Sequence, residues 1–225
     1  MAQTDKKPSD VDACYQRLHE AIVRGTLSPN QRLVELELAE QWGVGRATVR
    51  TVLDRLVQDG LVEHLPNRGA HVRNITVEEA IEMYEARAVI EGLAARYAAR
   101  HATRADIAEL QQLVVEMEGA LAAGDLVALS AHNAHLHAKI LQMAKHRTAA
   151  RLLERLQAQH VHFQYRMILV PGRAAHSMQE HYAIVAAIAA HDSGAAEKAM
   201  CQHLTHTVDA LRHNAQVIAL RITLP

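Results

Sequence analysis

Apolar residues recur at helical spacing along most of this chain, and that periodicity limits the folds it can adopt. From residue 76 onward, only short polar or Gly/Pro-containing stretches interrupt the helical pattern. Thr76 with Glu79 three positions later is a capping-box start, and Thr103 and Asp125 are candidate N-caps. The predicted helices cover residues 77–100, 103–123, 126–144, 146–168, 174–191 and 194–220. Antiparallel helices of these lengths can bury a core, so we expect a six-helix bundle.

The first 73 residues mix helical spacing with a short β-type segment. Helical spacing starts at Val11 and ends at Gly25, and it resumes over Arg46–Asp59 after a glycine-containing turn. Residues on either side of the run Pro66-Asn67-Arg68-Gly69 predict two short strands joined by a turn. With a short helix near residues 35–41, the expected order is helix, helix, turn, helix, hairpin. This order predicts a winged helix-turn-helix domain.

The fold class is therefore mainly α, with two domains of different kinds. We expect a disordered polar stretch at 1–10, a winged helix-turn-helix at 11–73, a link at 74–76 and an all-helical domain at 77–220. Aromatic residues make up only 3% of the 225 residues, while 49% are apolar and 22% charged, as in a helical globular protein.

Charge and cysteine content limit the function classes. The formal net charge of −1 does not indicate a nucleic-acid binder, so such a function depends on where individual charges lie. Cys14 and Cys201 cannot build a disulfide framework or a cysteine-type zinc site, and they fit a reducing cytoplasm. The sequence offers no secretory leader and no apolar run of membrane-spanning length. We expect a cytoplasmic protein with no membrane partner.

Arginines lie where a helix-turn-helix contacts double-stranded DNA. The second helix of the motif enters the major groove with its N-terminal residues at the base edges. Arg46 and Arg50 are four residues apart at the start of that helix, so they share one face, and Thr48 lies near them. Arginine bonds guanine in a bidentate manner, and threonine contacts bases or phosphates.

The predicted hairpin adds a second group of DNA-contact candidates. Arg68 and Gly69 form its tip, and His71 follows on the second strand. A cationic tip of this kind can reach phosphates or the minor groove. Arg32 is a further candidate for a phosphate contact.

Histidine is concentrated in the helical half: three of the 16 histidines lie in residues 1–75 and thirteen beyond. Asn133 and His137 are four apart on one helix face, His181 opens an apolar helix, and His203 lies on the last helix. A lone buried histidine is usually structural, but helices of a bundle can aim several ligands at one interior point. Imidazoles with one amide oxygen suit divalent metals from zinc to manganese. His206 is a candidate hydrogen-bonding partner behind these ligands.

Four segments resemble the DNA-binding domain of the GntR family: Ile22–Pro29, Leu38–Arg50, Leu56–Val62 and Asn67–Ala70. The rest of the chain resembles the all-helical ligand domain, termed FCD, of the FadR-type subfamily. Two departures concern DNA contacts. Gly45 stands where the family usually has serine, and Thr51 stands where it has glutamate, so we expect Arg50 to lack a neighbouring acidic partner.

The resemblance implies a metal site made by the same amide and three histidines, with zinc as the first candidate and nickel, manganese or iron as others. Asn133 replaces an acidic residue in many members, and an uncharged ligand leaves the ion's charge available to an anionic effector. Arg87 matches a subfamily position that often faces the same pocket. It could hold a small carboxylate effector or pair with Glu91 four residues later.

Together these features predict a ligand-responsive transcription regulator that binds a palindromic DNA operator as a homodimer, with repression as the expected mode. One alternative is a metal-free regulator of the same fold that binds an acyl ligand. A metal-dependent enzyme is disfavoured, because there is no HExxH motif and no acid placed as a general base. Glu180 adjoins His181, but sequential neighbours on a helix point in different directions.

Overall fold

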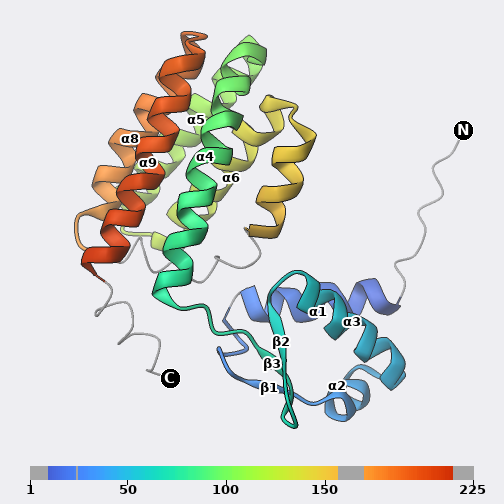
Figure 1. Cartoon of the computed structure of the whole chain (residues 1–225). Helices are drawn as coiled ribbons and strands as arrows, with labels where there is room; N and C mark the ends of the chain where they lie inside the picture. The colour runs from blue at the N-terminus through green and yellow to red at the C-terminus, as the bar shows by residue number, and fades with distance from the viewer. Residues whose placement is uncertain (1–9, 24, 157–169, 215–225) are drawn as a thin grey trace, which may run out of the picture. The chain divides into compact units, whose positions relative to one another are not determined.

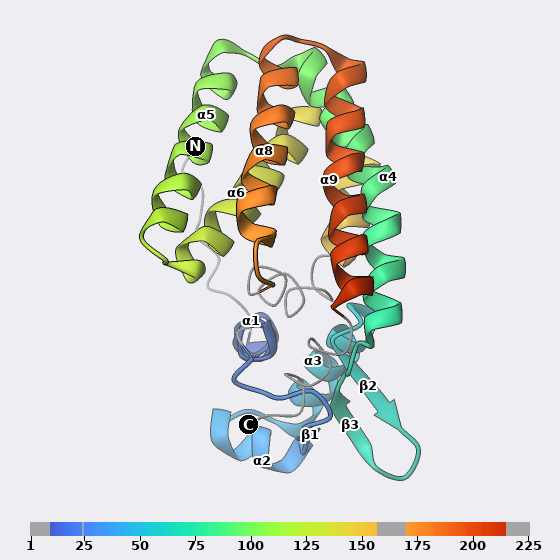
Figure 2. The same ribbon diagram turned by 90° about the vertical axis from the view of Figure 1, so that its left-hand side faces the viewer.

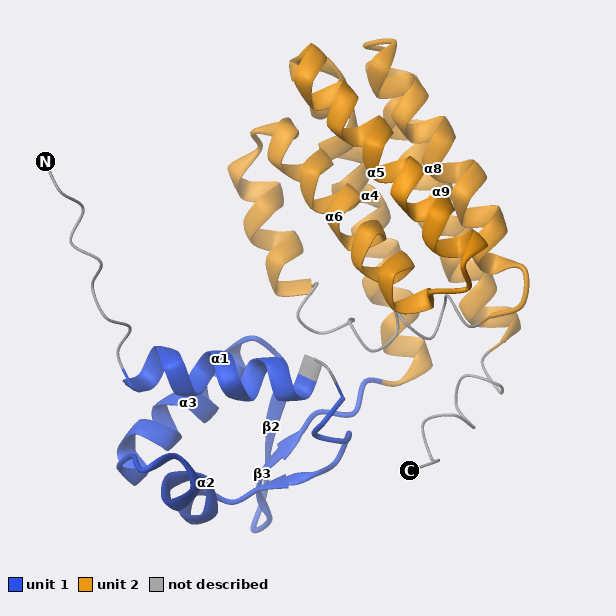
Figure 3. Ribbon diagram, turned by 180° about the vertical axis from the view of Figure 1, so that it is seen from behind, with its two compact units in different colours: residues 1–75 blue, residues 76–225 orange. Residues whose placement is uncertain are grey.

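The structure is a computed structural model that describes residues 10–23, 25–156 and 170–214 (Figure 1). It divides into two compact units, Met1–Ile75 and Thr76–Pro225 (Figure 3). In the described residues, the first unit combines helices with a small sheet, and the second is helical.

The first unit is a winged helix-turn-helix. Its elements in order are α1 Asp10–Val23, β1 Arg32–Leu33, α2 Glu35–Trp42, α3 Arg46–Gln58, β2 Val62–Leu65 and β3 Gly69–Val72. Helix α2 ends at Gly43, whose φ of 67° is a left-handed conformation that glycine adopts without steric cost. Leu18 and Ile22 of α1 pack on the α3 side that carries Leu53, and all three side chains are buried. The helical periodicity of the sequence is thus the periodicity of this core.

The sheet contains one strand more than the sequence predicts. It is antiparallel with the order β1-β3-β2, so β3 is its central strand. Strand β1 pairs Arg32 with His71 and Leu33 with Ala70. Two residues are too short for an alternating pattern, and β1 is therefore fixed by its pairing rather than by its own sequence.

The second unit begins with α4 Val77–His101 and continues with α5 Arg104–Ala122, α6 Leu126–Ala144, a helical segment over 147–156, α8 Arg173–Ala189 and α9 Ser193–His213. The predicted caps are present. The Thr76 side chain accepts from the backbone N–H of Glu79, Thr103 forms a full capping box with Asp106, and the Asp125 side chain accepts from the N–H of Ala128. These short-range bonds explain why the helices begin where the sequence predicts.

Five helices of this unit form a closed ring: α4 packs on α9, α9 on α8, α8 on α5, α5 on α6, and α6 on α4 (Figure 2). Inside it lie fully buried side chains such as Leu110, Met117, Leu136, Ile184 and Ile188. The ring encloses the space in which polar side chains from different helices can meet.

Most predicted helices agree with the observed ones to within a few residues. The predictions over 146–168 and 194–220 extend into 157–169 and 215–220, which lie outside the described residues. None of the helices in the described ranges is both long and apolar enough to cross a membrane.

Gly92 lies at a close contact between α4 and α9. A Cβ atom at this position would overlap the Sγ of Cys201 and approach the backbone oxygen of Glu197 to 3.4 Å. The Cys201 thiol in turn donates to the carbonyl oxygen of Ala88, at 3.2 Å. The absence of a side chain at Gly92 therefore allows the two helices to touch.

We expect Gly92→Ala to lower the free energy of unfolding by about 1–3 kcal/mol, the usual cost of overpacking a core, as measured by urea denaturation. Gly119→Ala on α5 is the matched control, because a Cβ there meets nothing within 4 Å. It should leave stability unchanged or raise it by about 0.5–1 kcal/mol. Adding Cys201→Ala should restore part of the loss. Equal stability of the two alanine variants would contradict this account of the contact.

Candidate functional site

Three histidines from three helices meet inside the second unit. His137 comes from α6, His181 from α8 and His203 from α9, and all are buried. Their ring centroids are 5.6 Å apart for His137 and His181, 5.3 Å for His137 and His203, and 4.5 Å for His181 and His203. Each offers one nitrogen such that the three atoms lie within 4.8 Å of one another. The structure thus brings together three side chains that are far apart in the sequence.

Two carboxylates, the buried Glu91 and the half-buried Glu180, orient two of these imidazoles. Glu91 Oε2 lies 2.5 Å from His137 Nδ1, and Glu180 Oε2 lies 2.6 Å from His203 Nδ1. Burial opposes ionisation of Glu91, yet Arg87 and His137 lower the pKa of Glu91 well below its usual range. Burial likewise opposes ionisation of Glu180, but His203 and Arg173 lower the pKa of Glu180 to about 2. An ionised carboxylate only accepts, so Nδ1 of each ring donates to it, and in a neutral ring Nε2 then carries the lone pair.

His181 is the most enclosed of the three histidines, with none of its surface exposed. Its Nδ1 lies 3.4 Å from Ser177 Oγ, whereas its Nε2 has no hydrogen-bond partner among the described residues. Burial lowers the pKa of His181 well below its usual range, and His203 and His137 add to the effect. Burial also lowers the pKa of His203 to about 4. Both imidazoles are therefore neutral near pH 7, the state in which histidine binds metals.

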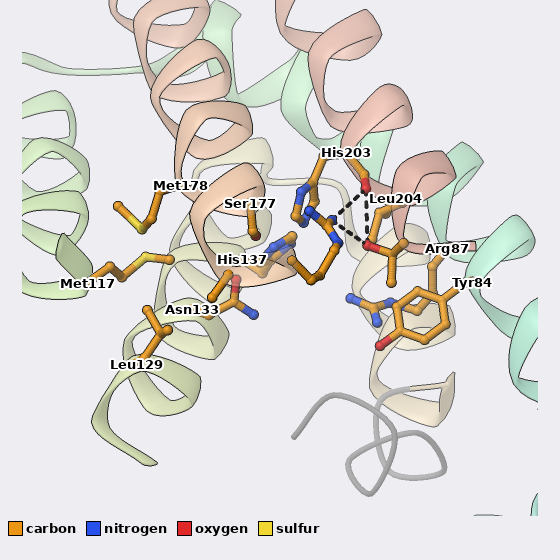
Figure 4. Close-up of a pocket in the computed structure, with 13 residues that line it drawn as sticks. Tyr84, Arg87, Met117, Leu129, Asn133, His137, Ser177, Met178, His203 and Leu204 are labelled. Carbon is orange, nitrogen blue, oxygen red and sulfur yellow. Dashed lines mark hydrogen bonds between the residues drawn. The ribbon is translucent and has the colours of Figure 1, made fainter. Parts of the chain in front are cut away.

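Two of these histidines, His137 and His203, line a cavity of about 60 Å³ (Figure 4). Its lining consists of Tyr84, Arg87, Met117, Leu129, Asn133, His137, Arg173, Ala174, Ser177, Met178, His203, Leu204 and Thr207. Asn133 is half-buried one turn before His137, and it lines the cavity with His137 and His203. The predicted amide therefore lies on the same cavity wall as two of the predicted histidines.

Arg87 lines this cavity and also forms the ion pair with Glu91 that the sequence left open as an alternative. The Arg87 Nε lies 2.7 Å and Nη2 2.6 Å from Glu91 Oε1, and the guanidinium lies 4.9 Å from the centre of the Tyr84 ring. Because Glu91 also holds His137, the three side chains form one buried chain of contacts. Arg87 thus acts on the histidine cluster through Glu91.

Arg173 is a buried site residue that the sequence did not indicate. Its Nη2 lies 2.9 Å from Glu180 Oε2, 3.3 Å from the carbonyl oxygen of His203 and 2.9 Å from Thr207 Oγ1. Its Nη1 is buried without a hydrogen-bond partner in the described part of the chain. Nothing in its immediate sequence distinguishes an arginine at the start of a helix from an exposed one, and only packing against α9 reveals its role.

The sequence did not predict the contacts that Glu180 makes with side chains of α9. Glu180 does point away from its neighbour His181, but it reaches across to His203 and to Nδ1 of His206, at 2.8 Å. His206, predicted to stand behind the ligands, therefore shares its carboxylate with a ligand candidate. Because Glu180 is committed to these partners, it is a positioning group.

On the first unit, Arg46 and Arg50 project from the start of α3 and are exposed, and Thr48 is half-buried beside them. The expectation that Arg50 lacks an acidic partner is wrong. Glu35 of α2 binds Arg50 through two contacts, Nε–Oε1 at 3.2 Å and Nη2–Oε2 at 3.0 Å. The same carboxylate lies 3.6 Å from Arg46 Nη2. The hydrogen bond from Arg50 lowers the pKa of Glu35.

The hairpin between β2 and β3 places Arg68 and Gly69 at an exposed turn, where Gly69 has a φ of 83°. Arg32 on β1 is exposed as well. His71 differs from the prediction, because it is only 6% exposed and its Nδ1 lies 3.1 Å from the Gly69 carbonyl oxygen. It lies on the central strand, where it pairs with Arg32 of β1 and Glu63 of β2. His71 therefore supports the hairpin, and its side chain is not presented for a DNA contact.

A winged helix-turn-helix with exposed arginines on its second helix, joined to a helical unit with a polar cavity, defines a DNA-binding transcription regulator. Residues 11–72 match the model for bacterial regulatory proteins of the gntR family, and residues 82–206 match the FCD domain. The chain therefore belongs to the GntR family of bacterial regulators and carries an FCD domain.

Similar proteins are regulators rather than enzymes. The uncharacterized HTH-type transcriptional regulator YdhC of Bacillus subtilis (strain 168) is 26% identical over 205 residues, covering 88% of this chain and 89% of YdhC. The HTH-type transcriptional repressor RspR of Escherichia coli (strain K12) is 26% identical over 202 residues, covering 90% and 89%. The solved structure of E. coli McbR/YncC has the same fold, with a TM-score of 0.76 at 21% identity over 92% of this chain and 99% of that one.

Glu35 should affect sequence discrimination by the recognition helix. We expect Glu35→Gln to raise affinity for random DNA, because it removes a negative charge that lies between Arg46 and Arg50 and would repel DNA phosphates. Discrimination for a duplex selected in vitro should fall by about 1 kcal/mol or more, since the arginines lose their orienting partner. Fluorescence anisotropy at several salt concentrations measures both. Glu37→Gln, an exposed acid on the same helix, is the control, and equal behaviour of the two variants would contradict the role of Glu35.

The buried neutral histidines predict a pH dependence in metal-free protein. As the pH falls below about 6.5, unfolded chains protonate both histidines. In folded chains the pKa of His203 is about 4 and that of His181 lies well below its usual range, so stability falls as the pH falls. For His203 the loss between pH 7 and 5.5 is on the order of 1 kcal/mol. Urea unfolding followed by circular dichroism with chelator present measures it. The His203→Gln variant should show a shallower slope, and a pH-independent wild type would disprove the assignment.

Proposed function

We propose that this chain is a repressor whose FCD domain binds a divalent metal and a small carboxylate effector, and that the effector alters operator affinity. His137, His181 and His203 would hold the metal, with Asn133 supplying an amide oxygen beside them. Zinc is the first candidate, because imidazole nitrogens with one oxygen suit it, and nickel, manganese and iron are the alternatives.

One observation carries the metal proposal: the lone pair of His181 Nε2 is buried without a hydrogen-bond partner among the described residues. Buried polar atoms in proteins are almost always satisfied, so a purely structural cluster would be expected to pair this nitrogen. The carboxylates that contact His137 and His203 support the same reading, since each occupies Nδ1 of its ring and leaves Nε2 for another partner. A cation among these nitrogens would satisfy all three.

The charges of the site favour an anionic effector. Three neutral imidazoles and a neutral amide leave the charge of a divalent ion uncompensated by its ligands. Arg87 and Arg173 add no net charge to the site, because each is paired with a glutamate. A carboxylate is the simplest partner that supplies both negative charge and oxygen ligands. The small cavity volume argues against the alternative of a long acyl ligand.

Operator binding would require two copies of the chain. One winged helix-turn-helix module makes too few contacts for tight binding at cellular salt, and a two-fold dimer would place one α3 in each half of a palindromic site. Arg32, Arg46, Thr48, Arg50, Arg68 and Gly69 are the proposed contacts. The name of RspR supports repression as the mode.

Metal content tests the proposal directly. Protein made without an affinity tag should contain about one zinc ion per chain by elemental analysis, as a single site of this kind requires. His137→Ala should abolish stoichiometric binding, whereas His135→Ala, an exposed histidine on the same helix, should not. Asn133→Asp should tighten binding because it adds a charged oxygen ligand. Wild-type protein that binds no divalent metal in a competition titration would disprove the metal proposal.

A further inference from the structure

Two buried side-chain atoms are left without hydrogen-bond partners among the described residues, and they need opposite partners. His181 Nε2 offers a lone pair, whereas Arg173 Nη1 carries hydrogens and can only donate. The proposed metal ion would satisfy the first atom and would leave the second unchanged. Arg173 Nη1 therefore needs an oxygen acceptor in addition to the metal.

We propose that Arg173, rather than Arg87, holds the acidic group of the effector, and that the effector is a short-chain monocarboxylate with an apolar tail. This inference rests on the proposed carboxylate-sensing function and specifies its ligand class. It assigns an anchoring role to a residue that no sequence motif identified.

The hydrogen bonds of the two arginines distinguish them. Arg87 directs Nε and Nη2 to Glu91 and lies over the Tyr84 ring, so its guanidinium is engaged within the protein. Arg173 makes its contacts to Glu180, Thr207 and the His203 backbone through Nη2 alone. Those contacts fix the orientation of the guanidinium while Nη1 remains available. Arg173 is thus a preorganised donor on the wall of the cavity.

Glu180 limits how an acid can bind to Arg173. Its carboxylate occupies Nη2 at 2.9 Å and neutralises much of the charge, so an effector meets one nitrogen instead of the full two-nitrogen fork. One carboxylate oxygen suffices for that contact, which leaves its second oxygen for the histidine cluster. The polar end of the cavity therefore accommodates a single carboxylate.

The other end of the cavity is apolar. Figure 4 shows Met117, Met178 and Leu129 gathered on one side of His137, with Tyr84 and Arg87 on the opposite side. All three apolar side chains are buried. Neither leucine nor methionine offers a strong hydrogen-bond partner, so a second carboxylate or a row of hydroxyls would be desolvated there without compensation. Dicarboxylates and sugar acids are thereby disfavoured.

The volume sets the length of the tail. A cavity of about 60 Å³ holds roughly four to six water-sized groups, at about 10–15 Å³ each. A carboxylate with a tail of two to four carbons matches that size, on the order of the same number of groups. Butyrate is therefore a suitable probe.

The experiment uses the full tag-free chain loaded with zinc, with binding measured by calorimetry and by the shift in Tm. We expect butyrate to bind and raise Tm, succinate and gluconate to bind about tenfold more weakly or worse, and butanol to give no shift. Arg173→Lys should weaken butyrate binding about tenfold or more while zinc content stays near that of the wild type. Arg87→Lys is the matched control and should change butyrate affinity less than Arg173→Lys. Met117→Gln should reduce the preference for butyrate over succinate.

Each outcome bears on a separate claim. Tighter binding of succinate or gluconate than of butyrate would overturn the ligand class. A larger effect of Arg87→Lys than of Arg173→Lys would overturn the anchor, and a zinc-loaded chain that binds no carboxylate would overturn the whole inference. If the chain bound no zinc but showed an Arg173-dependent Tm shift with butyrate, the metal proposal would fail while the anchor and ligand class remained supported.

Discussion

Two carboxylates, the buried Glu91 and the half-buried Glu180, organise the interior of the FCD domain. Glu91 joins Arg87 to His137, and Glu180 joins Arg173 to His203, so each carboxylate lies between a guanidinium and an imidazole. A buried charge without such partners costs several kcal/mol, and removing one member of a pair leaves the others uncompensated. These charge contacts join α4 to α6 and α8 to α9, and the packing of the helices keeps the charged partners together.

Which histidines face the interior could be predicted from the sequence because that evidence is local, and the resemblance to the FadR-type subfamily implied that they meet. Asn133 and His137 share a helix face by spacing, and His181 begins an apolar helix, so both could be placed facing the interior without knowing how the helices pack. The caps at Thr103 and Asp125 are local in the same sense. Each of these features depends on residues within one turn of a helix.

Features that depend on contacts between distant elements could not be predicted in this way. Arg173 meets His203 and Thr207 across 30 or more residues, and Glu35 meets Arg50 across 15. His71 pairs with Arg32 of β1, a two-residue strand that is defined by its pairing with β3. In each case the residue type was visible in the sequence, but its partner was fixed by tertiary structure.

The contact at Gly92 gives these observations a geometric consequence. Gly92 follows Glu91 on α4, and Cys201 lies two residues before His203 on α9, so the point where the helices touch adjoins both halves of the site. Because Gly92 carries a hydrogen atom where alanine carries a methyl group, α4 and α9 can approach closely at this point. Gly92 thereby sets the distance between α4, which carries Glu91, and α9, which carries His203.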